Sequence, residues 1–174
     1  LNSKGLNKIV LHQTHHSVRA LLQSKLIQTS SAERTLLKNL GSWLGRLTLA
    51  RNRPILKRDC SMKDLILDAY ERGLLIAVMP FVAKVLEASK MSKVFKPSQP
   101  WIASLLSLLC ELHSISDLKL NLKFEVEVLC RNLNVALSEI PKSSLLAERQ
   151  VDRTNNHDFT TSNIPGGLGG SQGG

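Results

Sequence analysis

A chain of 174 residues, 43% of them hydrophobic, is long enough for one globular domain with a core. Leucine dominates the apolar residues and aromatics make up only 4%, which favours helices packed on helices. No apolar run approaches the roughly 20 residues that a membrane span needs, so we expect no span. The net charge of +9 favours acidic partners, namely nucleic acid, an anionic surface or acidic protein patches, without choosing among them.

The two ends of the chain and its cysteines bear on processing and compartment. The opening Leu1-Asn2-Ser3-Lys4 has no initiating Met and no signal-peptide pattern, so we expect a piece of a longer polypeptide. The cysteines Cys60, Cys110 and Cys130 lie far apart in the sequence. We therefore expect reduced, buried thiols rather than disulfides or a zinc site, which favours the cytosol or nucleus.

The first half of the chain carries three helical patterns. Apolar residues at helical spacing predict a helix over residues 6–26. Ser30 and Glu33 have capping-box spacing and begin the clearest amphipathic pattern, which predicts a second helix to about residue 51. Pro54 and its charged neighbours predict a loop over residues 52–60. Ser61 or a neighbour is then expected to cap a third helix over residues 62–70.

The next segment is nearly apolar on all sides. Gly73 predicts a break, and residues 74–86 then predict a buried helix that Pro80 should kink or begin. Residues 96–100 predict a stiff linker, with Pro100 in the first turn of a fifth helix that ends near His113.

Residues 118–128 are ambiguous because apolar and polar residues alternate strictly, which is the pattern of a strand. The same segment also places Leu118, Leu122, Val126 and Leu129 along one helical stripe. A lone strand would leave its backbone groups unpaired, so we predict a sixth helix.

The apolar periodicity stops after Pro141, and the chain ends in a Gly-rich stretch. We therefore predict a helical domain over residues 1–141 and a flexible tail over residues 142–174. Six helices with short connections favour an all-α fold, an α-solenoid of antiparallel HEAT-like hairpins, with a compact helical bundle as the alternative.

Positive charge is concentrated between Arg34 and Arg58, where no acidic residue occurs. A solvated face and a partner-binding patch are equally reasonable interpretations. A basic helical RNA-binding module is the alternative function, and it would use the basic patch Arg51, Arg53, Lys57 and Arg58. RNA binding is less favoured because Trp43 and Trp101 lie in apolar stripes and are expected in the core rather than available for base stacking.

Small residues and histidines give weaker signals. Gly41 and Gly45 are four residues apart in the second helix, which predicts close approach of a neighbouring helix of the same domain or of a partner. The three histidines His12, His15 and His16 are interpreted as surface residues, since nothing nearby completes a metal site. No catalytic or phosphate-binding motif is found, so we predict neither an enzyme nor a cofactor.

Three blocks carry a family resemblance: LLKNLGSWLG at residues 36–45, PFVAKVLE at residues 80–87 and DLKLNLKFEVEVL at residues 117–129. Together with the linker VFKPSQPW at residues 94–101, they resemble the central domain of the Not-one scaffold subunits of the CCR-four-NOT deadenylase complex. The resemblance covers residues 1–146, and the opening of the chain is plant-like. That domain is similar to the middle domain of initiation factor four G.

The resemblance implies a stack of HEAT-type hairpins that lacks its first helices here, and a scaffold in mRNA deadenylation, decay and translational repression. It implies binding of the CAF deadenylase subunit and of a DEAD-box RNA helicase. Other subunits would bind elsewhere on a longer chain, RNA contact would be mainly indirect, and no membrane is involved. The implied location is the cytoplasm, including processing bodies, with the nucleus as a second location.

Partner-binding residues are predicted only as polar or large residues within or near the matching blocks. They are Lys38, Trp43, Arg46, Tyr70, Lys84, His113, Lys119, Asn121 and Lys123.

Overall fold

The structure, a computed structural model, describes residues 3–160, and this part of the chain contains six α-helices and no strand. The all-α prediction is confirmed. The helices are α1 (Ser3–Leu22), α2 (Ser31–Leu47), α3 (Met62–Arg72), α4 (Leu75–Glu87), α5 (Pro100–His113) and α6 (Leu120–Asn132). Three short 3-10 helices follow some of them, η1 (Leu49–Arg51), η2 (Ala88–Met91) and η3 (Leu137–Glu139).

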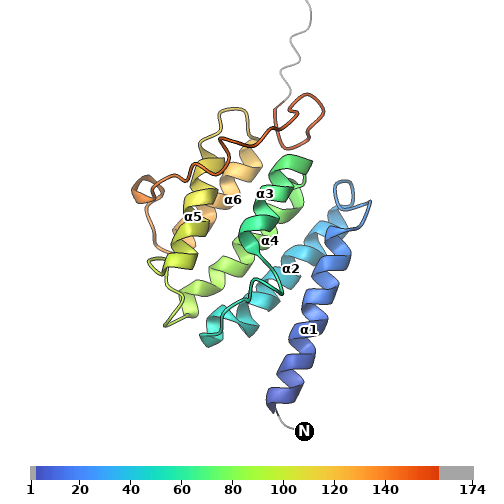
Figure 1. The fold of residues 1–174 in the computed structure, drawn as a ribbon, viewed down its shortest axis with the longest axis vertical. Helices are drawn as coiled ribbons and strands as arrows, with labels where there is room; N and C mark the ends of the chain where they lie inside the picture. The colour runs from blue at the N-terminus through green and yellow to red at the C-terminus, as the bar shows by residue number, and fades with distance from the viewer. Residues whose placement is uncertain (1–2, 161–174) are drawn as a thin grey trace, which may run out of the picture.

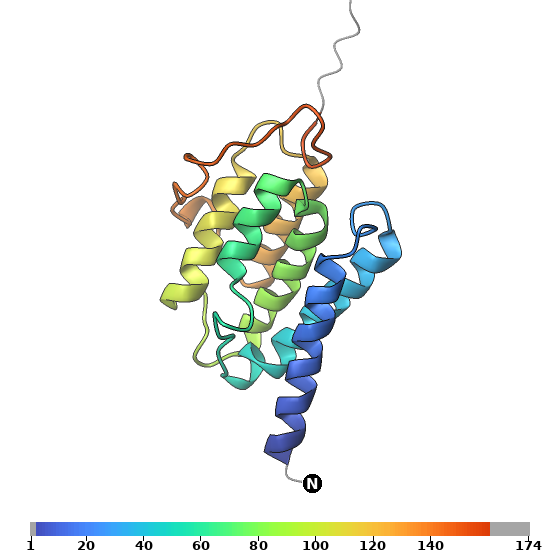
Figure 2. The same ribbon diagram turned by 45° about the vertical axis from the view of Figure 1, so that its right-hand side comes forward.

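The helices form two layers of a solenoid-like stack. Figure 1 shows α1, α3 and α5 in front and α2, α4 and α6 behind them, and the turned view in Figure 2 keeps the same order. Each front helix packs on the helix that follows it in the chain, and α4 packs between α2 and α6. Successive pairs therefore stack side by side as hairpins, as the periodicity and the resemblance predict.

Local signals place most helix ends where the sequence predicts them. The hydroxyl of Ser30 accepts a hydrogen bond from the Glu33 N–H at 3.2 Å, and Ser61 does the same for Asp64 at 3.4 Å. Gly73 ends α3 in the left-handed conformation at φ 70, a backbone conformation that glycine adopts easily. The Gln99 side chain caps α5, whose first residue is Pro100.

Two helices end earlier than predicted. The helix predicted over residues 6–26 is α1 and ends at Leu22, and the helix predicted to residue 51 ends at Leu47. At the second position the Thr48 hydroxyl donates to the Leu44 carbonyl at 2.6 Å, and the chain tightens into η1. Asn52 then takes a left-handed conformation at φ 58, which stops the helical path.

The core lies between the layers, with α4 at its centre. Phe81, Leu75 and Leu86 of α4 are fully buried, and Pro80 lies inside this helix rather than at its start. Gly41 and Gly45 of α2 allow α4 to approach closely. A Cβ at Gly41 would lie 2.6 Å from the Phe81 carbonyl oxygen, so the neighbour predicted for these glycines is a helix of the same domain.

The ambiguous segment forms α6 from Leu120 onward, which confirms the helix prediction. Leu122, Val126 and Leu129 are buried along one stripe. Leu118 is not helical, because it forms an isolated antiparallel bridge with Phe159. The helix therefore begins two residues later than the predicted segment, because Leu118 pairs with a residue of the segment expected to be a tail.

Residues 142–160, which we call the C-terminal strap, differ from the flexible tail that the sequence predicts. Figure 1 shows the strap in orange and red, passing α5 and reaching the upper ends of α3 and α6. Leu146 and Phe159 are buried, with Phe159 only 1% exposed. The folded part therefore continues past Pro141, because single apolar anchors hold a segment without helical periodicity. The Gly-rich end lies outside the described residues.

The strap also completes a helix end. Leu74 precedes α4 without a side-chain cap, and the carboxylate of Asp158 accepts hydrogen bonds from the N–H groups of Leu75 and Ile76 at 2.9 and 3.1 Å. A negative group at a helix N-terminus satisfies free N–H groups and interacts favourably with the helix dipole. Residue 158 therefore supplies a cap that the local sequence of α4 lacks.

His15 corrects a second expectation, because it was interpreted as a surface histidine and is only 5% exposed. It lies on the side of α1 that faces residues 59–61, where it shares a cavity with Arg19, Asp59 and Cys60. Burial lowers the pKa of the His15 imidazole, and the carboxylate of Asp59 partly offsets this shift.

Between residues 3 and 160 no helix has the length and apolar character needed to cross a membrane.

Candidate protein-binding surface

A groove runs along the contact between α2 and α4 on the outer side of their layer. It has a volume of about 280 Å³ and is lined by Ser42, Arg46, Ala50, Lys84, Glu87, Ala88, Lys90 and Met91. Arg46 and Lys84, two of the predicted partner-binding residues, are therefore brought together. Lys38 lies one helical turn before Ser42 and is half-buried.

A second surface feature is an apolar row on α6. Leu120, Phe124 and Val128 are 70%, 58% and 42% exposed, and their spacing of four residues places them on one side of the helix. We call these three residues the α6 stripe. Asn121, another predicted contact residue, is exposed in the same first turn. Exposed apolar rows of this kind mark sites of protein association more often than single exposed residues do.

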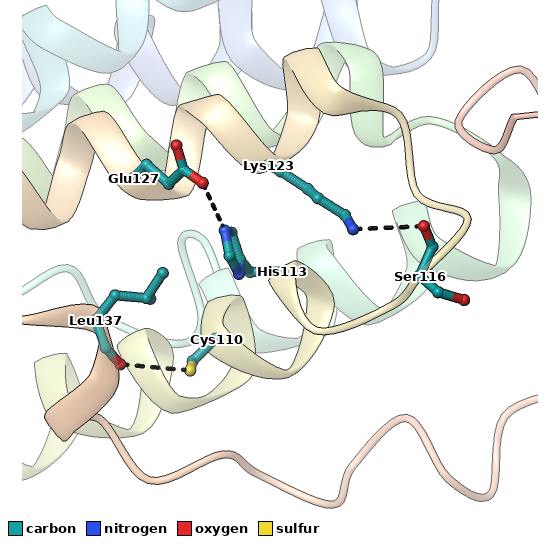
Figure 3. Close-up of polar contacts among 6 residues, drawn as sticks. All are labelled: Cys110, His113, Ser116, Lys123, Glu127 and Leu137. Carbon is teal, nitrogen blue, oxygen red and sulfur yellow. Dashed lines mark hydrogen bonds and ion pairs between the residues drawn. The ribbon is translucent and has the colours of Figure 1, made fainter.

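Polar contacts join α6 to α5 and to the loop between them. His113 Nε2 lies 2.9 Å from the Glu127 carboxylate, and Lys123 Nζ lies 3.5 Å from the Ser116 carbonyl (Figure 3). Figure 3 also shows the Cys110 thiol directed at the Leu137 carbonyl. Two predicted partner residues, His113 and Lys123, therefore already hold this hairpin together. Lys119 precedes α6, where its N–H donates to the Asp158 carbonyl.

The two aromatic residues of the predicted set have opposite environments. Tyr70 is 4% exposed and contacts Phe159 edge to face, with the ring centres 6.3 Å apart, so its ring belongs to the core. Trp43 was expected in the core and is 44% exposed. It lines a shallow cavity with Ile9 and Leu40 between α1 and α2, because its position on α2 points away from α4.

The predicted basic patch is exposed throughout. Arg51 lies in η1, while Arg53, Lys57 and Arg58 lie in the loop that follows. None of these four side chains forms an ion pair within residues 3–160. The loop is held at its start by Asn52, whose Oδ1 accepts hydrogen bonds from the N–H groups of Lys93 and Val94.

The thiols of the described chain are poorly suited to nucleophilic chemistry. Burial raises the pKa of the Cys60 thiol to about 11 and also raises the pKa of Cys110 and Cys130. All three thiols are free, and Cys110 and Cys130 are buried. Within residues 3–160 no group of His, Cys, Asp and Glu side chains is arranged to hold a metal ion.

Sequence reasoning missed the α6 stripe and the C-terminal strap. The signal for the stripe was present, since a helix with buried Leu122 and Val126 leaves the remaining apolar residues of the alternating pattern outside. The strap had a weaker signal, a single Phe159 within a polar segment. Only the tertiary contacts identify the core that this ring fills.

Comparison with known proteins gives consistent matches. The family model described as the CCR4-NOT transcription complex subunit 1 CAF1-binding domain matches residues 1–156. The General negative regulator of transcription subunit 1 of Schizosaccharomyces pombe is 43% identical over 153 residues, covering 88% of this chain and 7% of the relative. The CCR4-NOT transcription complex subunit let-711 of Caenorhabditis elegans is 43% identical over 150 residues, covering 83% of this chain and 6% of the relative.

A third relative, the General negative regulator of transcription subunit 1 of Saccharomyces cerevisiae, is 36% identical over 154 residues, covering 88% of this chain and 7% of the relative. The chain thus spans less than a tenth of the length of these relatives. The matching family is described by the protein it binds and not by a reaction. By the match to residues 1–156 and the identity over most of its length, the chain belongs to the family of CCR4-NOT transcription complex subunit 1 CAF1-binding domains.

Proposed function

We propose that this chain is a non-catalytic scaffold segment that binds the CAF1 deadenylase subunit of a CCR4-NOT complex. The observation that carries the proposal is the family match over residues 1–156, which includes all six helices. The surface chemistry supports it, because a row of large apolar side chains is exposed on α6. A scaffold of this kind acts by raising the effective concentration of a nuclease near its substrate, which requires no catalytic group.

The α6 stripe is the contact that we assign to the deadenylase. Leu120, Phe124 and Val128 offer large apolar side chains on a rigid helix, and the half-buried Lys123 and exposed Asn121 provide a polar border. Interfaces commonly combine an apolar centre of large side chains with a polar rim. His113 and Glu127 hold α6 on α5, so the stripe is presented with little ordering cost.

A pull-down with purified CAF1 tests both the function and the surface. The wild-type chain is expected to retain CAF1, and Phe124→Asp is expected to lose most of it because a charge enters the apolar centre. Leu26→Asp is the matched control, since Leu26 is similarly exposed at 57% but lies between α1 and α2. Circular dichroism should show the same helix content for all three proteins.

The outcomes separate function from surface. Failure of the folded wild-type chain to retain CAF1 would refute the deadenylase-binding function for this segment. Equal retention by wild type, Phe124→Asp and Leu26→Asp would leave the function standing and refute the assignment to the α6 stripe.

The resemblance of the sequence to Not-one scaffolds supports a second partner, a DEAD-box RNA helicase, within the same proposal. A separate pull-down with the helicase alone tests this partner, and a folded chain that does not retain the helicase at moderate salt would remove it from the proposal.

The free thiols agree with a reducing compartment such as the cytosol or nucleus.

A further inference from the structure

Two segments without acidic residues meet in this fold. Residues 34–58 contain seven Lys and Arg residues and no Asp or Glu, and residues 88–110 contain Lys90, Lys93 and Lys96 and no Asp or Glu. The two segments are far apart in the sequence, and η1 of the first packs on η2 of the second. Cations from the end of the first segment and the start of the second therefore lie on the two 3-10 helices that pack together and just after them, which neither segment alone predicts.

Asn52 fixes this meeting point. Its side-chain Oδ1 accepts hydrogen bonds from the Ser92 hydroxyl at 3.1 Å, the Lys93 N–H at 2.7 Å and the Val94 N–H at 3.3 Å. The left-handed backbone at Asn52 turns the side chain of a loop residue toward the end of η2. The backbone that carries Lys93 is therefore held to the end of η1 by hydrogen bonds from Ser92, Lys93 and Val94 to Asn52.

The groove between α2 and α4 opens beside this meeting point. Arg46, Lys84 and Lys90 line it from three different elements, and Glu87 is its only acidic residue. The Glu87 carboxylate lies 3.0 Å from Lys84 Nζ and so offsets one of the three cations. Arg51 and Lys93 are exposed on η1 and just after η2, which adds positive potential at the end of the groove.

The lining of the groove suits an anionic backbone better than a folded protein partner. Its remaining residues are small or flexible, namely Ser42, Ala50, Ala88 and the exposed Met91, and no deep apolar pocket for an anchor side chain is formed. Proteins that hold single-stranded nucleic acid use a positively charged groove along the phosphate backbone, often with an exposed aromatic ring nearby. Trp43 is exposed but lines the cavity between α1 and α2 and points away from α4, so the cations of the groove, and not base stacking, carry such a contact.

We propose that the groove formed by Arg46, Lys84 and Lys90, which we call the cationic groove, binds the phosphate backbone of single-stranded RNA. This contact is direct and lies on α2, α4 and η2, whereas the basic patch predicted from sequence lies in the loop after η1. It goes beyond the deadenylase contact assigned to the α6 stripe. A scaffold with both surfaces holds a message and a nuclease on one rigid body.

Salt-dependent binding of a labelled RNA tests the cationic groove. The probe is a 5′-fluorescein-labelled oligoadenylate of 15 nucleotides, titrated with the full 174-residue chain and followed by fluorescence anisotropy at 50 to 200 mM NaCl. The test variant combines Arg46→Gln, Lys84→Gln and Lys90→Gln. The control variant combines Lys8→Gln, Lys25→Gln and Arg131→Gln, which removes the same charge at three exposed positions away from the groove.

We expect the test variant to bind the RNA at least ten-fold more weakly than wild type at 50 mM NaCl, and the control variant less than three-fold more weakly. Each single-strand phosphate contact contributes about 0.7 to the slope of log affinity against log salt, so loss of three contacts should reduce the slope by about 2. Both variants should keep the wild-type thermal midpoint and retain CAF1 in the pull-down. A failed RNA test is thereby distinguished from a failed deadenylase contact.

Three results would overturn the cationic groove. The first is equal weakening by the test and control variants, which would assign the affinity to net charge alone. The second is absence of RNA binding by the wild-type chain at 50 mM NaCl. The third is displacement of the RNA by an oligoglutamate peptide at the same charge concentration, which would assign the groove to an acidic protein segment.

Discussion

Phe159→Ala tests whether the C-terminal strap is an integral part of the fold. The ring is 1% exposed, contacts Tyr70 edge to face and lies under the Arg153 guanidinium, 4.9 Å from its centre. Loss of a buried Phe side chain usually costs about 3 to 5 kcal/mol. Without this anchor the strap can detach, and the loss is then limited to the free energy with which the strap docks. We therefore expect a decrease of about 2 to 4 kcal/mol in the free energy of unfolding.

Urea denaturation followed by circular dichroism measures this loss, and hydrogen exchange locates it. The Leu75 and Ile76 amides donate to Asp158, and the Lys119 amide donates to the carbonyl of the same residue, so all three should exchange faster in the variant. Phe124→Ala is the matched control, because the same side chain is removed at a 58% exposed position. A loss below about 1 kcal/mol with unchanged exchange at these amides would show that Phe159 does not anchor the strap, since a buried ring normally contributes more.

Substitutions at Gly41, Ser30 and His15 test close packing, helix capping and a buried titratable group. Gly41→Ala places a Cβ 2.6 Å from the Phe81 carbonyl oxygen and should lower the free energy of unfolding by about 1 to 3 kcal/mol, whereas Gly5→Ala, with nothing within 4 Å, should raise it by about 0.5 to 1. An unchanged free energy of unfolding in Gly41→Ala would show that α2 and α4 separate easily. Ser30→Ala removes the cap of α2 and should cost about 1 kcal/mol in urea denaturation, with exposed Ser31→Ala near zero; equal effects would contradict the capping role. The lowered pKa of His15 means that protonation favours the unfolded chain, so stability is complete above about pH 6.5 and falls as the pH drops toward the folded-state pKa. Urea midpoints between pH 5 and 7.5 should fall less in His15→Gln than in wild type or exposed His16→Gln, and parallel profiles for all three proteins would count against this role.

Helix identity was accessible from the sequence because its causes are local. Ser30, Ser61 and Gly73 act within one turn of the helix ends they define, and Pro100 begins α5 for the same short-range reason. The two boundary errors at Leu22 and Leu47 arose where apolar residues continued past the point at which the backbone turns away.

The environments of several residues in the predicted contact set could not be read from the sequence, which shows a helical face but not what lies opposite it. Trp43 shares spacing with buried leucines and yet faces the edge between α1 and α2. Tyr70 was chosen as a large polar residue, and the strap covers it through Phe159. His113 and Lys123 also form contacts within the domain, His113 with Glu127 of α6 and Lys123 with Ser116 in the loop between α5 and α6. The environments of Trp43 and Tyr70 depend on neighbours distant in the sequence.

The helical class, most helix ends and the family could be predicted from the sequence, since these depend on local spacing, capping and matching blocks. Three features required the folded chain: Asp158 caps α4, Phe159 fills the core beside Tyr70, and two acid-free segments meet at Asn52. These contacts join residues 40 to 90 positions apart, roughly, and their energy comes from burial and hydrogen bonds that no local pattern records.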